Sequence, residues 1–382
     1  MHILNKNYNK EYVQIYIWRT LSLVSSFASL LIVIPHISDN KELFGIYSFC
    51  ISLSLYLSYA DIGFLGSGQK YAAEEYAKGN RTAEIKILGF TAFILIVMVI
   101  PFTIAMIFLS FNPHLIIDEL SSEGVMIASK LFLILGIITP IEILLTRVMQ
   151  SILIIRIKDY ISLRIQIIFN LISILSVLYF FAGDKYQIVE YFLFKSVMAL
   201  IGSIVIICLI KKIESYDYTK LLKSIKFNKA FYQKSKKLAG SSALLTVSWV
   251  IFYELDIVII GKIFGAEEVA IYAIAFTFLN FLRNIWNIIY SPYSQRFNHL
   301  SVESTSNKLK KLASQIIDYT FPLCIITTIT LIISSDYFIK LWVGQTYSSS
   351  IILMQILIIS SFMVLLTNQP NITLQQKQNT LI

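Results

Sequence analysis

The sequence predicts an all-α protein that crosses a membrane about ten times. Of its 382 residues, 56% are hydrophobic and 14% are charged, and the mean hydropathy is +0.70. An ordinary soluble domain carries about 25% charged residues. Apolar runs of about 20 residues, enough for a helix to span the hydrocarbon core, recur along the whole chain. These observations exclude an ordinary soluble protein and predict a polytopic membrane protein.

Ten runs are long and apolar enough to be predicted spans. They are 14–35, 44–66, 87–110, 125–149, 161–182, 188–210, 240–262, 268–291, 315–334 and 349–369. Pro101, Pro140 and Pro322 lie inside three of these runs. Each is a candidate kink or an ordinary proline of a membrane helix.

The basic residues predict the topology. The formal net charge is +9, and most of the 32 lysines and arginines fall in alternate loops, starting with the N-terminal segment. The opposite loops hold only Lys41, Lys185, Lys262 and Lys340, and they collect acidic residues. Because positive loops stay on the cytoplasmic side, both termini are predicted to be cytoplasmic.

The longest loop predicts the domain boundary. Residues 211–239 are rich in lysine and separate six spans from four. The segment suits an amphipathic helix on an anionic membrane surface, and it suits a solvated linker equally well. We therefore expect an N-terminal six-helix bundle at 1–211, a basic cytoplasmic linker at 212–239 and a C-terminal four-helix bundle at 240–382.

A diverged repeat relates the two halves. ELFGIY at 42–47 opens one helix, and EEVAIY at 267–272 opens another. The order of spans and loops then matches spans 1–6 to spans 7–12, with both halves running in the same direction. Parallel repeats of this kind are one plan of membrane transporters. The sequence ends where an eleventh span is expected, so the prediction has two forms: a protein of ten helices, or a chain whose C-terminal pair is missing.

The glycine-rich stretch ADIGFLGSGQKYAAEEYAKGN at 60–80 carries a resemblance to a family. It resembles the O-antigen repeat-unit flippases (Wzx type) of the multidrug/oligosaccharidyl-lipid/polysaccharide exporter superfamily. The likeness extends over the chain in the order of spans, the basic middle loop and the half-repeat. Members usually have twelve or more spans, and this chain departs from that pattern.

The resemblance implies a MATE-like fold, with two bundles around a cavity that opens alternately to each membrane face. It implies a flippase that moves undecaprenyl-pyrophosphate-linked O-antigen or polysaccharide repeat units to the periplasmic leaflet of a bacterial inner membrane. Expected partners are this substrate, membrane lipids and, by the same likeness, a polysaccharide polymerase and a chain-length regulator. Nucleic acid is not an expected partner.

Arg283 is the foremost candidate for substrate binding. It lies near the middle of the predicted span 268–291, and Asn280, Asn284 and Asn287 share its helix face by spacing. A guanidinium flanked by amides suits phosphate and sugar hydroxyls. The family resemblance also implies an arginine on this span. A structural ion pair is the alternative for Arg283.

Three further basic residues are candidates for the same role. Lys195 and Lys130 lie inside spans toward the outer side, where a lysine can also extend to the membrane surface. Arg19 lies about one turn inside the first span, and the resemblance implies functional arginines on that helix. Its alternative is an anchor at the inner face.

Four acidic residues within predicted spans are candidates for ion coupling or gating: Asp256, Glu254, Asp61 and Glu142. A buried carboxylate can carry a coupling proton or pair with an arginine. For Asp61 a gate or helix-terminus role is expected, with helix capping as the alternative. No cofactor is expected, although coupling to a proton or a sodium ion remains open.

Two other functions compete with the flippase. An exporter of organic cations from the same superfamily would favour a cavity rich in acids. A membrane polysaccharide polymerase would need a large periplasmic loop, whereas the largest loop here is basic and cytoplasmic. The three cysteines and four histidines form no metal-ligand or disulfide pattern, so neither a metal site nor an enzyme is expected.

Overall fold

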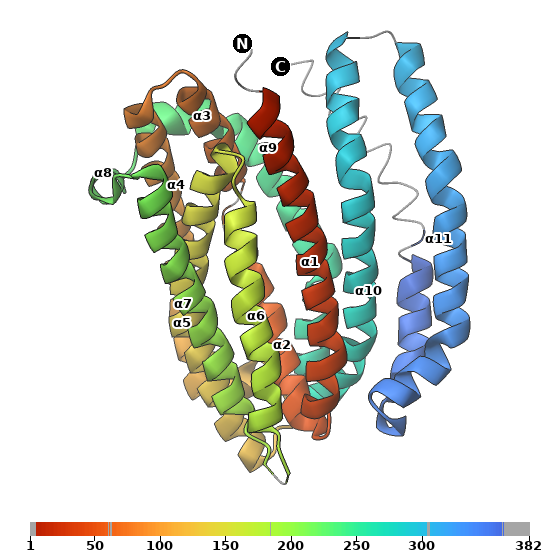
Figure 1. The fold of residues 1–382 in the computed structure, drawn as a ribbon. Coiled ribbons are helices and arrows are strands. Elements are labelled where there is room, and N and C mark those ends of the chain that lie inside the picture. The colour runs from red at the N-terminus through yellow and green to blue at the C-terminus, as the bar shows by residue number, and fades with distance from the viewer. Residues whose placement is uncertain are drawn as a thin grey trace. The chain divides into compact units, whose positions relative to one another are not determined.

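The computed structural model describes residues 5–59, 61, 63–183, 185–303, 306–360 and 362. Within these ranges, side chains are not described for 5–10, 12, 58, 249, 252–253, 287–303, 306–313, 316–317 and 319. All regular elements in the described chain are helical (Figure 1), so the predicted all-α class is confirmed.

The helices follow the chain in this order. They are α1 (Asn5–Ile37), α2 (Lys41–Ser58), α3 (Phe64–Ala77), α4 (Arg81–Phe111), η1 (Pro113–Leu115), α5 (Ser122–Ile155), α6 (Tyr160–Phe180), α7 (Ile188–Glu214), α8 (Tyr218–Lys223), α9 (Lys229–Tyr253), α10 (Leu255–Glu303), α11 (Ser306–Trp342) and η2 (Gln345–Tyr347). A shorter apolar helix, Ser349–Ser360, follows η2.

Six described helices are long and apolar enough to cross a membrane. They contain the segments Val13–Ile37, Arg81–Phe111, Ser122–Ile155, Tyr160–Phe180, Ile188–Glu214 and Thr320–Trp342. Each exceeds the length that a bilayer core requires. The prediction of a helical multi-span membrane protein is therefore confirmed.

The other four predicted spans differ from their expected form. The predicted end of the second span at residue 66 is wrong, because α2 ends at Ser58. The predicted span 240–262 is divided between α9 and α10, and the predicted span 268–291 is the continuation of α10 beyond Gly265, where φ is 80°. The last part of 349–369 lies outside the described residues.

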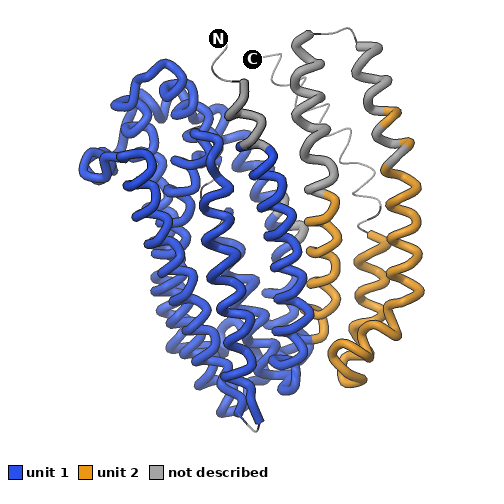
Figure 2. Tube along the Cα trace, viewed as in Figure 1, with its two compact units in different colours: residues 1–270 blue, residues 271–382 orange. Residues whose placement is uncertain are grey.

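The chain divides into two compact units, residues 1–270 and residues 271–382 (Figure 2). The predicted division into an N-terminal bundle at 1–211, a linker at 212–239 and a C-terminal bundle at 240–382 stays a prediction.

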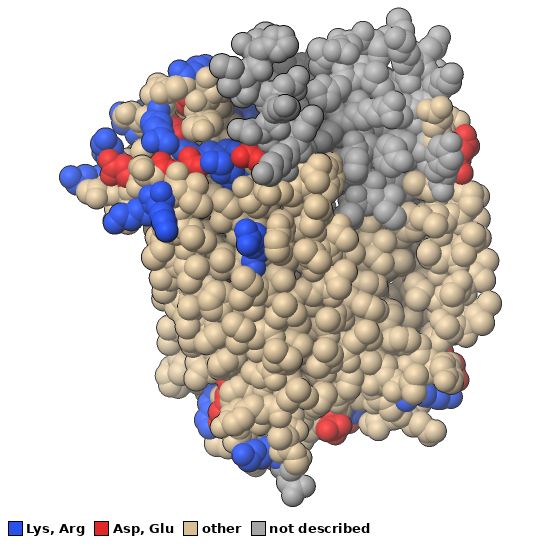
Figure 3. Space-filling model, viewed as in Figure 1, with Lys and Arg blue, Asp and Glu red and all other residues tan. Residues whose placement is uncertain are grey.

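The first unit is a bundle with a charge-poor middle. Helix α5 packs against α2, α4 and α7, and α6 packs against α1 and α7. Charged side chains gather at the two ends of its helices, with few between them (Figure 3). We call the end that holds α3, α8 and the start of α4 the basic end. This distribution is the one that a bilayer imposes on a membrane bundle.

The chain segments at the start of the two motif copies meet at the end of the first unit opposite the basic end. The Lys41 ammonium lies 3.4 Å from the Glu267 carboxylate. A Cβ added to Gly45 would lie 1.8 Å from the carbonyl oxygen of Ala266, so the two backbones touch there. Glycine at this position therefore allows α2 and the start of the second motif copy to approach each other closely.

The glycine-rich motif contains the whole of α3, and its three glycines lie just before α3 and in the first turns of that helix. Gly63 has a φ of 73°, and its added Cβ would lie 2.4 Å from Cβ of Ser242 on α9. Gly68 faces α4, where an added Cβ would lie 2.2 Å from the Thr91 hydroxyl. Gly66 faces open space. Two of the three glycines thus fix close helix packing at the basic end.

We expect Gly63→Ala to destabilise the protein by about 1–3 kcal/mol, because alanine resists a positive φ and its methyl group would collide with α9. Gly66→Ala is the matched control. It places a better helix former in α3 without a collision, so stability should rise by about 0.5–1 kcal/mol. Thermal unfolding of both variants in detergent measures the difference, and equal midpoints would contradict this packing.

The second unit has its own core. Leu282 and Trp286 on α10 pack against Cys324 on α11. Ser350, in the short helix after η2, donates a hydrogen bond of 2.7 Å to the carbonyl oxygen of Ile271. These contacts join α10, α11 and the short helix.

Candidate functional site: a polar cavity within the bundle

Two adjoining cavities lie inside the first unit. Their volumes are about 250 and about 140 Å³, and both are lined by Glu142, Lys195 and Ala199. The remaining lining residues are Ile51, Ser54, Thr139, Thr146, Gln166, Phe169, Asn170, Phe192, Ser173, Ser196, Gly202 and Ser203. We call these two spaces together the polar cavity. It has the polar partners and the room that water requires.

Helical spacing brings the polar side chains to one place. Thr139, Glu142 and Thr146 are three and four residues apart on α5. Gln166 and Asn170 are four apart on α6 and form a second short stripe. Because residues three or four apart share a helix face, each stripe faces the cavity. The sequence therefore carried a readable signal for this site in its uncharged polar residues.

Lys195 lies about two turns inside α7 and its ammonium group is tied to α2. It donates a hydrogen bond of 3.1 Å to the Tyr47 hydroxyl. The ammonium also lies 5.6 Å from the centroid of the Tyr47 ring. Tyr47 itself is buried. The contact holds the lysine within the bundle, away from the helix end, and turns a fixed positive charge toward the cavity.

Glu142 lies near the middle of α5 and has hydroxyl partners. Thr146 donates a hydrogen bond of 2.7 Å to its carboxylate, and the Thr146 hydroxyl also contacts the Ser203 hydroxyl on α7. In the part of the chain that the structure describes, Glu142 and Lys195 are not within 4.0 Å of each other. The cavity is thus lined by one basic and one acidic side chain.

An amide contact joins α6 to α1 beside the cavity. The Asn170 side chain on α6 donates a hydrogen bond of 2.9 Å to the Ser25 hydroxyl, which is buried on α1. Such pairs supply hydrogen-bond partners to polar groups, which lipid chains cannot do. Helices α1, α2, α5, α6 and α7 together therefore position the site.

The other basic candidates of the first unit lie elsewhere. Arg19 is half-exposed and forms an ion pair of 3.1 Å with Asp159, at the turn before α6. The two predicted roles of Arg19, substrate binding and an anchor at the inner face, both stay predictions. Lys130 is exposed on α5 and does not line the polar cavity. The structure places Lys195 and Glu142 at the polar cavity, whereas Arg19 and Lys130 lie outside it.

The remaining acidic candidates lie near helix breaks. The Asp61 carboxylate accepts a hydrogen bond of 3.1 Å from the backbone of Leu65, so it contacts the start of α3. Glu254 is buried where α9 ends, and its carbonyl oxygen accepts a hydrogen bond of 2.7 Å from Tyr56 on α2. Tyr56 thus satisfies a backbone carbonyl group that is freed where the predicted span 240–262 breaks. Asp256 is exposed, at the start of α10.

The arginine and amide group of the second unit lies on α10. The Arg283 guanidinium is 5.8 Å from the centroid of the Phe276 ring. Asn280 and Arg283 are partly buried and Asn284 is exposed, whereas the Asn287 side chain lies outside the described residues. Because Leu282 and Trp286 turn toward α11, the polar residues occupy a different face of α10.

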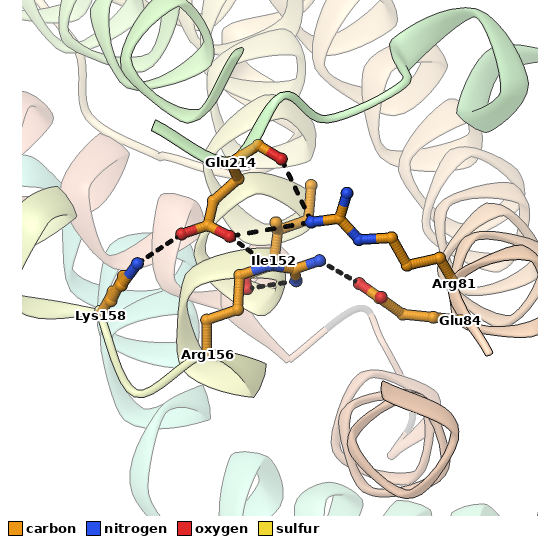
Figure 4. A network of polar contacts seen from close by, with 6 residues as sticks. All are labelled: Arg81, Glu84, Ile152, Arg156, Lys158 and Glu214. Carbon is orange, nitrogen blue, oxygen red and sulfur yellow. Dashed lines mark hydrogen bonds and ion pairs between the residues drawn. The ribbon is translucent and has the colours of Figure 1, made fainter. Parts of the chain in front are cut away.

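A buried ion network at the basic end was not predicted (Figure 4). Arg156, at the end of α5, pairs with Glu84 on α4 at 2.8 Å and with Glu214 on α7 at 3.1 Å. The side chains of Glu84 and Arg156 are 0% and 1% exposed. Lys158 and Arg81 approach Glu214 from the surface, at 2.6 and 4.0 Å. The network therefore joins the ends of three helices.

The surroundings of the network stabilise its charges. The Arg156 guanidinium lies 4.6 Å from the Tyr76 ring centroid and 5.3 Å from that of Tyr216. Its hydrogen bond to the Ile152 carbonyl oxygen is 2.9 Å long. The hydrogen bond that Lys158 donates to Glu214 raises the pKa of the Lys158 ammonium. Counting basic residues by loop could not reveal this pairing, because the three helix ends are far apart in sequence.

Comparisons with protein-family models, curated proteins and solved structures give no match to this chain. The class that the fold defines is a helical multi-span membrane protein with a polar cavity inside its first unit. Among the described residues, no group of three or more histidine, cysteine, aspartate or glutamate side chains could hold a metal ion.

Proposed function

We propose that this protein is a transporter that moves a lipid-linked, phosphate-bearing oligosaccharide across the membrane. The observation that carries the proposal is the polar cavity, in which Lys195 faces a space surrounded by hydroxyl and amide groups. An ammonium group suits a phosphate, and hydroxyl and amide groups suit sugars. An ionisable residue held inside a membrane bundle marks a substrate or ion pathway.

The finer form of the proposal follows the family resemblance. The substrate would be an undecaprenyl-pyrophosphate-linked O-antigen or polysaccharide repeat unit, moved from the cytoplasmic to the periplasmic leaflet by alternating access. Arg283, with Asn280 and Asn284 beside it on α10, supplies a second group of the chemistry that phosphate and sugars require. The excess of lysine and arginine supports a cytoplasmic position for the basic end.

The carboxylate of Glu142 favours a second candidate, an exporter of organic cations. It lines the same cavity as Lys195 and has hydroxyl partners. The same carboxylate suits a coupling proton or sodium ion in the flippase. Expression in drug-sensitive cells separates the two functions, because a cation exporter would raise drug resistance and a flippase would not.

Arg283 gives a direct test of the flippase. In cells that lack their own polysaccharide flippase, we expect the wild-type chain to restore surface polysaccharide and Arg283→Ala to abolish it. Arg283→Lys keeps the charge but loses bidentate contacts, so partial export is expected. Blotting of membranes verifies insertion of each variant. Normal polysaccharide from a well-inserted Arg283→Ala protein would contradict this role.

A further inference from the structure

A separate pocket lies at the basic end of the first unit. Its volume is about 480 Å³, within the range of pockets that hold small ligands. It is formed by the start of α4 and by the segment that joins α8 to α9. The lining residues are Lys86, Lys223, Ser224, Lys226, Phe227, Asn228, Lys229 and Ala230.

The charge of this pocket is uniformly positive. Its four lysines, Lys86, Lys223, Lys226 and Lys229, are all exposed. Among the described residues, no carboxylate lies within 4.0 Å of their ammonium groups. Nearby acids have other partners, since Glu214 belongs to the buried network and Asp217 pairs with Lys220 at 3.1 Å. The four like charges therefore lack a counterion among the side chains that the structure describes.

Apolar side chains accompany the lysines of the pocket. The Phe227 ring lies 5.9 Å from the ring of Phe90 and 6.4 Å from that of Phe93, both within the apolar part of α4. Phe227 is nevertheless 52% exposed, and Leu222 on α8, next in sequence to the lining residue Lys223, is 67% exposed. Exposed apolar groups with lysines around them are typical of a protein surface at a membrane interface.

The pocket is held in shape by backbone contacts. A Cβ added to Gly89 would lie 2.5 Å from the carbonyl oxygen of Ser224, so the turn after α8 rests directly on α4. The Asn228 side chain accepts a hydrogen bond of 3.1 Å from the backbone of Phe231 and caps α9. The segment that carries three of the four lysines is therefore fixed. Figure 3 shows basic side chains gathered where Figure 1 places α8.

We propose that this pocket binds the headgroup of an anionic phospholipid of the surrounding membrane. The lysines would surround the headgroup phosphate, and the acyl chains would pass along Phe227 and Leu222. A free phosphate has the charge but not the apolar part that these two residues require. The site is remote from the polar cavity and does not depend on the proposed transport.

Native mass spectrometry of the full chain tests the proposal, with phosphatidylglycerol and phosphatidylcholine as probes. Each lysine near an anionic surface contributes about fivefold to affinity. Replacing all four pocket lysines by glutamine should therefore weaken binding of the first phosphatidylglycerol by at least about tenfold. The matched control replaces four exposed lysines that do not line the pocket, Lys211, Lys212, Lys236 and Lys237, and should weaken binding of the first phosphatidylglycerol much less than the pocket variant does.

Three results would overturn the proposal. Equal losses in the two variants would indicate attraction by overall charge and not by the pocket. Phosphatidylcholine bound as tightly as phosphatidylglycerol would exclude recognition of an anion. Inorganic phosphate that displaces the lipid at equal concentration would indicate a site for free phosphate. Equal thermal midpoints of the variants and the wild type establish that folding is unchanged.

Discussion

Arg156→Met should lower the stability of the protein by about 3–5 kcal/mol. The substitution removes the partner that the Glu84 and Glu214 carboxylates share. Both carboxylates then stay buried near each other, and that of Glu84 is 0% exposed. A buried charge that loses its partner retains its full desolvation cost. The effect should be visible as a large drop in the thermal midpoint of the detergent-solubilised chain.

Arg81→Gln is the matched control for the network. Arg81 is 53% exposed and lies 4.0 Å from Glu214, so its loss should cost at most about 1 kcal/mol. Adding Glu84→Leu to Arg156→Met removes one stranded carboxylate, and part of the lost stability should return. An Arg156→Met protein as stable as Arg81→Gln would contradict the structural role of this network.

Lys195→Met should reduce export of lipid-linked oligosaccharide by at least about tenfold, because an ammonium contact to phosphate contributes about 1.5–3 kcal/mol. The substitution removes the positive charge from both parts of the polar cavity. Lys195→Arg keeps the charge and should retain more export. Surface polysaccharide in flippase-deficient cells is the measurement.

A lysine on the same helix provides the control for Lys195. Lys211 is exposed near the end of α7 and does not line the polar cavity. Lys211→Met makes the same change of charge and length, and export should be unchanged. Both variants should have similar thermal midpoints. If Lys195→Met exports as well as Lys211→Met, the polar cavity is not the substrate site.

The membrane character of the fold was predictable because it depends on composition. Long apolar helices are required wherever lipid surrounds the chain, and their length follows from the bilayer thickness. The helix break at Glu254 was not predictable in this way. It depends on Tyr56, almost two hundred residues away in sequence, which satisfies the freed carbonyl oxygen.

The charged members of the site were easier to predict than its geometry. Lys195 and Glu142 are conspicuous because charges inside apolar runs are costly. The pairing of Arg156 with Glu84 and Glu214 was missed because all three lie at helix ends, where charge is ordinary. Only the packing of α4, α5 and α7 shows that these ends are buried together.

The most direct test of the proposed function is a translocation assay with purified protein in vesicles. A labelled undecaprenyl-pyrophosphate oligosaccharide is placed in both leaflets, and an impermeant lectin reports the fraction in the outer leaflet. In vesicles without protein, the lectin cannot reach the labelled lipid of the inner leaflet. We predict that this lipid becomes accessible to the lectin in vesicles that contain the wild-type protein, and that it does so more slowly with Lys195→Met. A pool that stays protected, in vesicles that contain folded wild-type protein, would contradict the proposal.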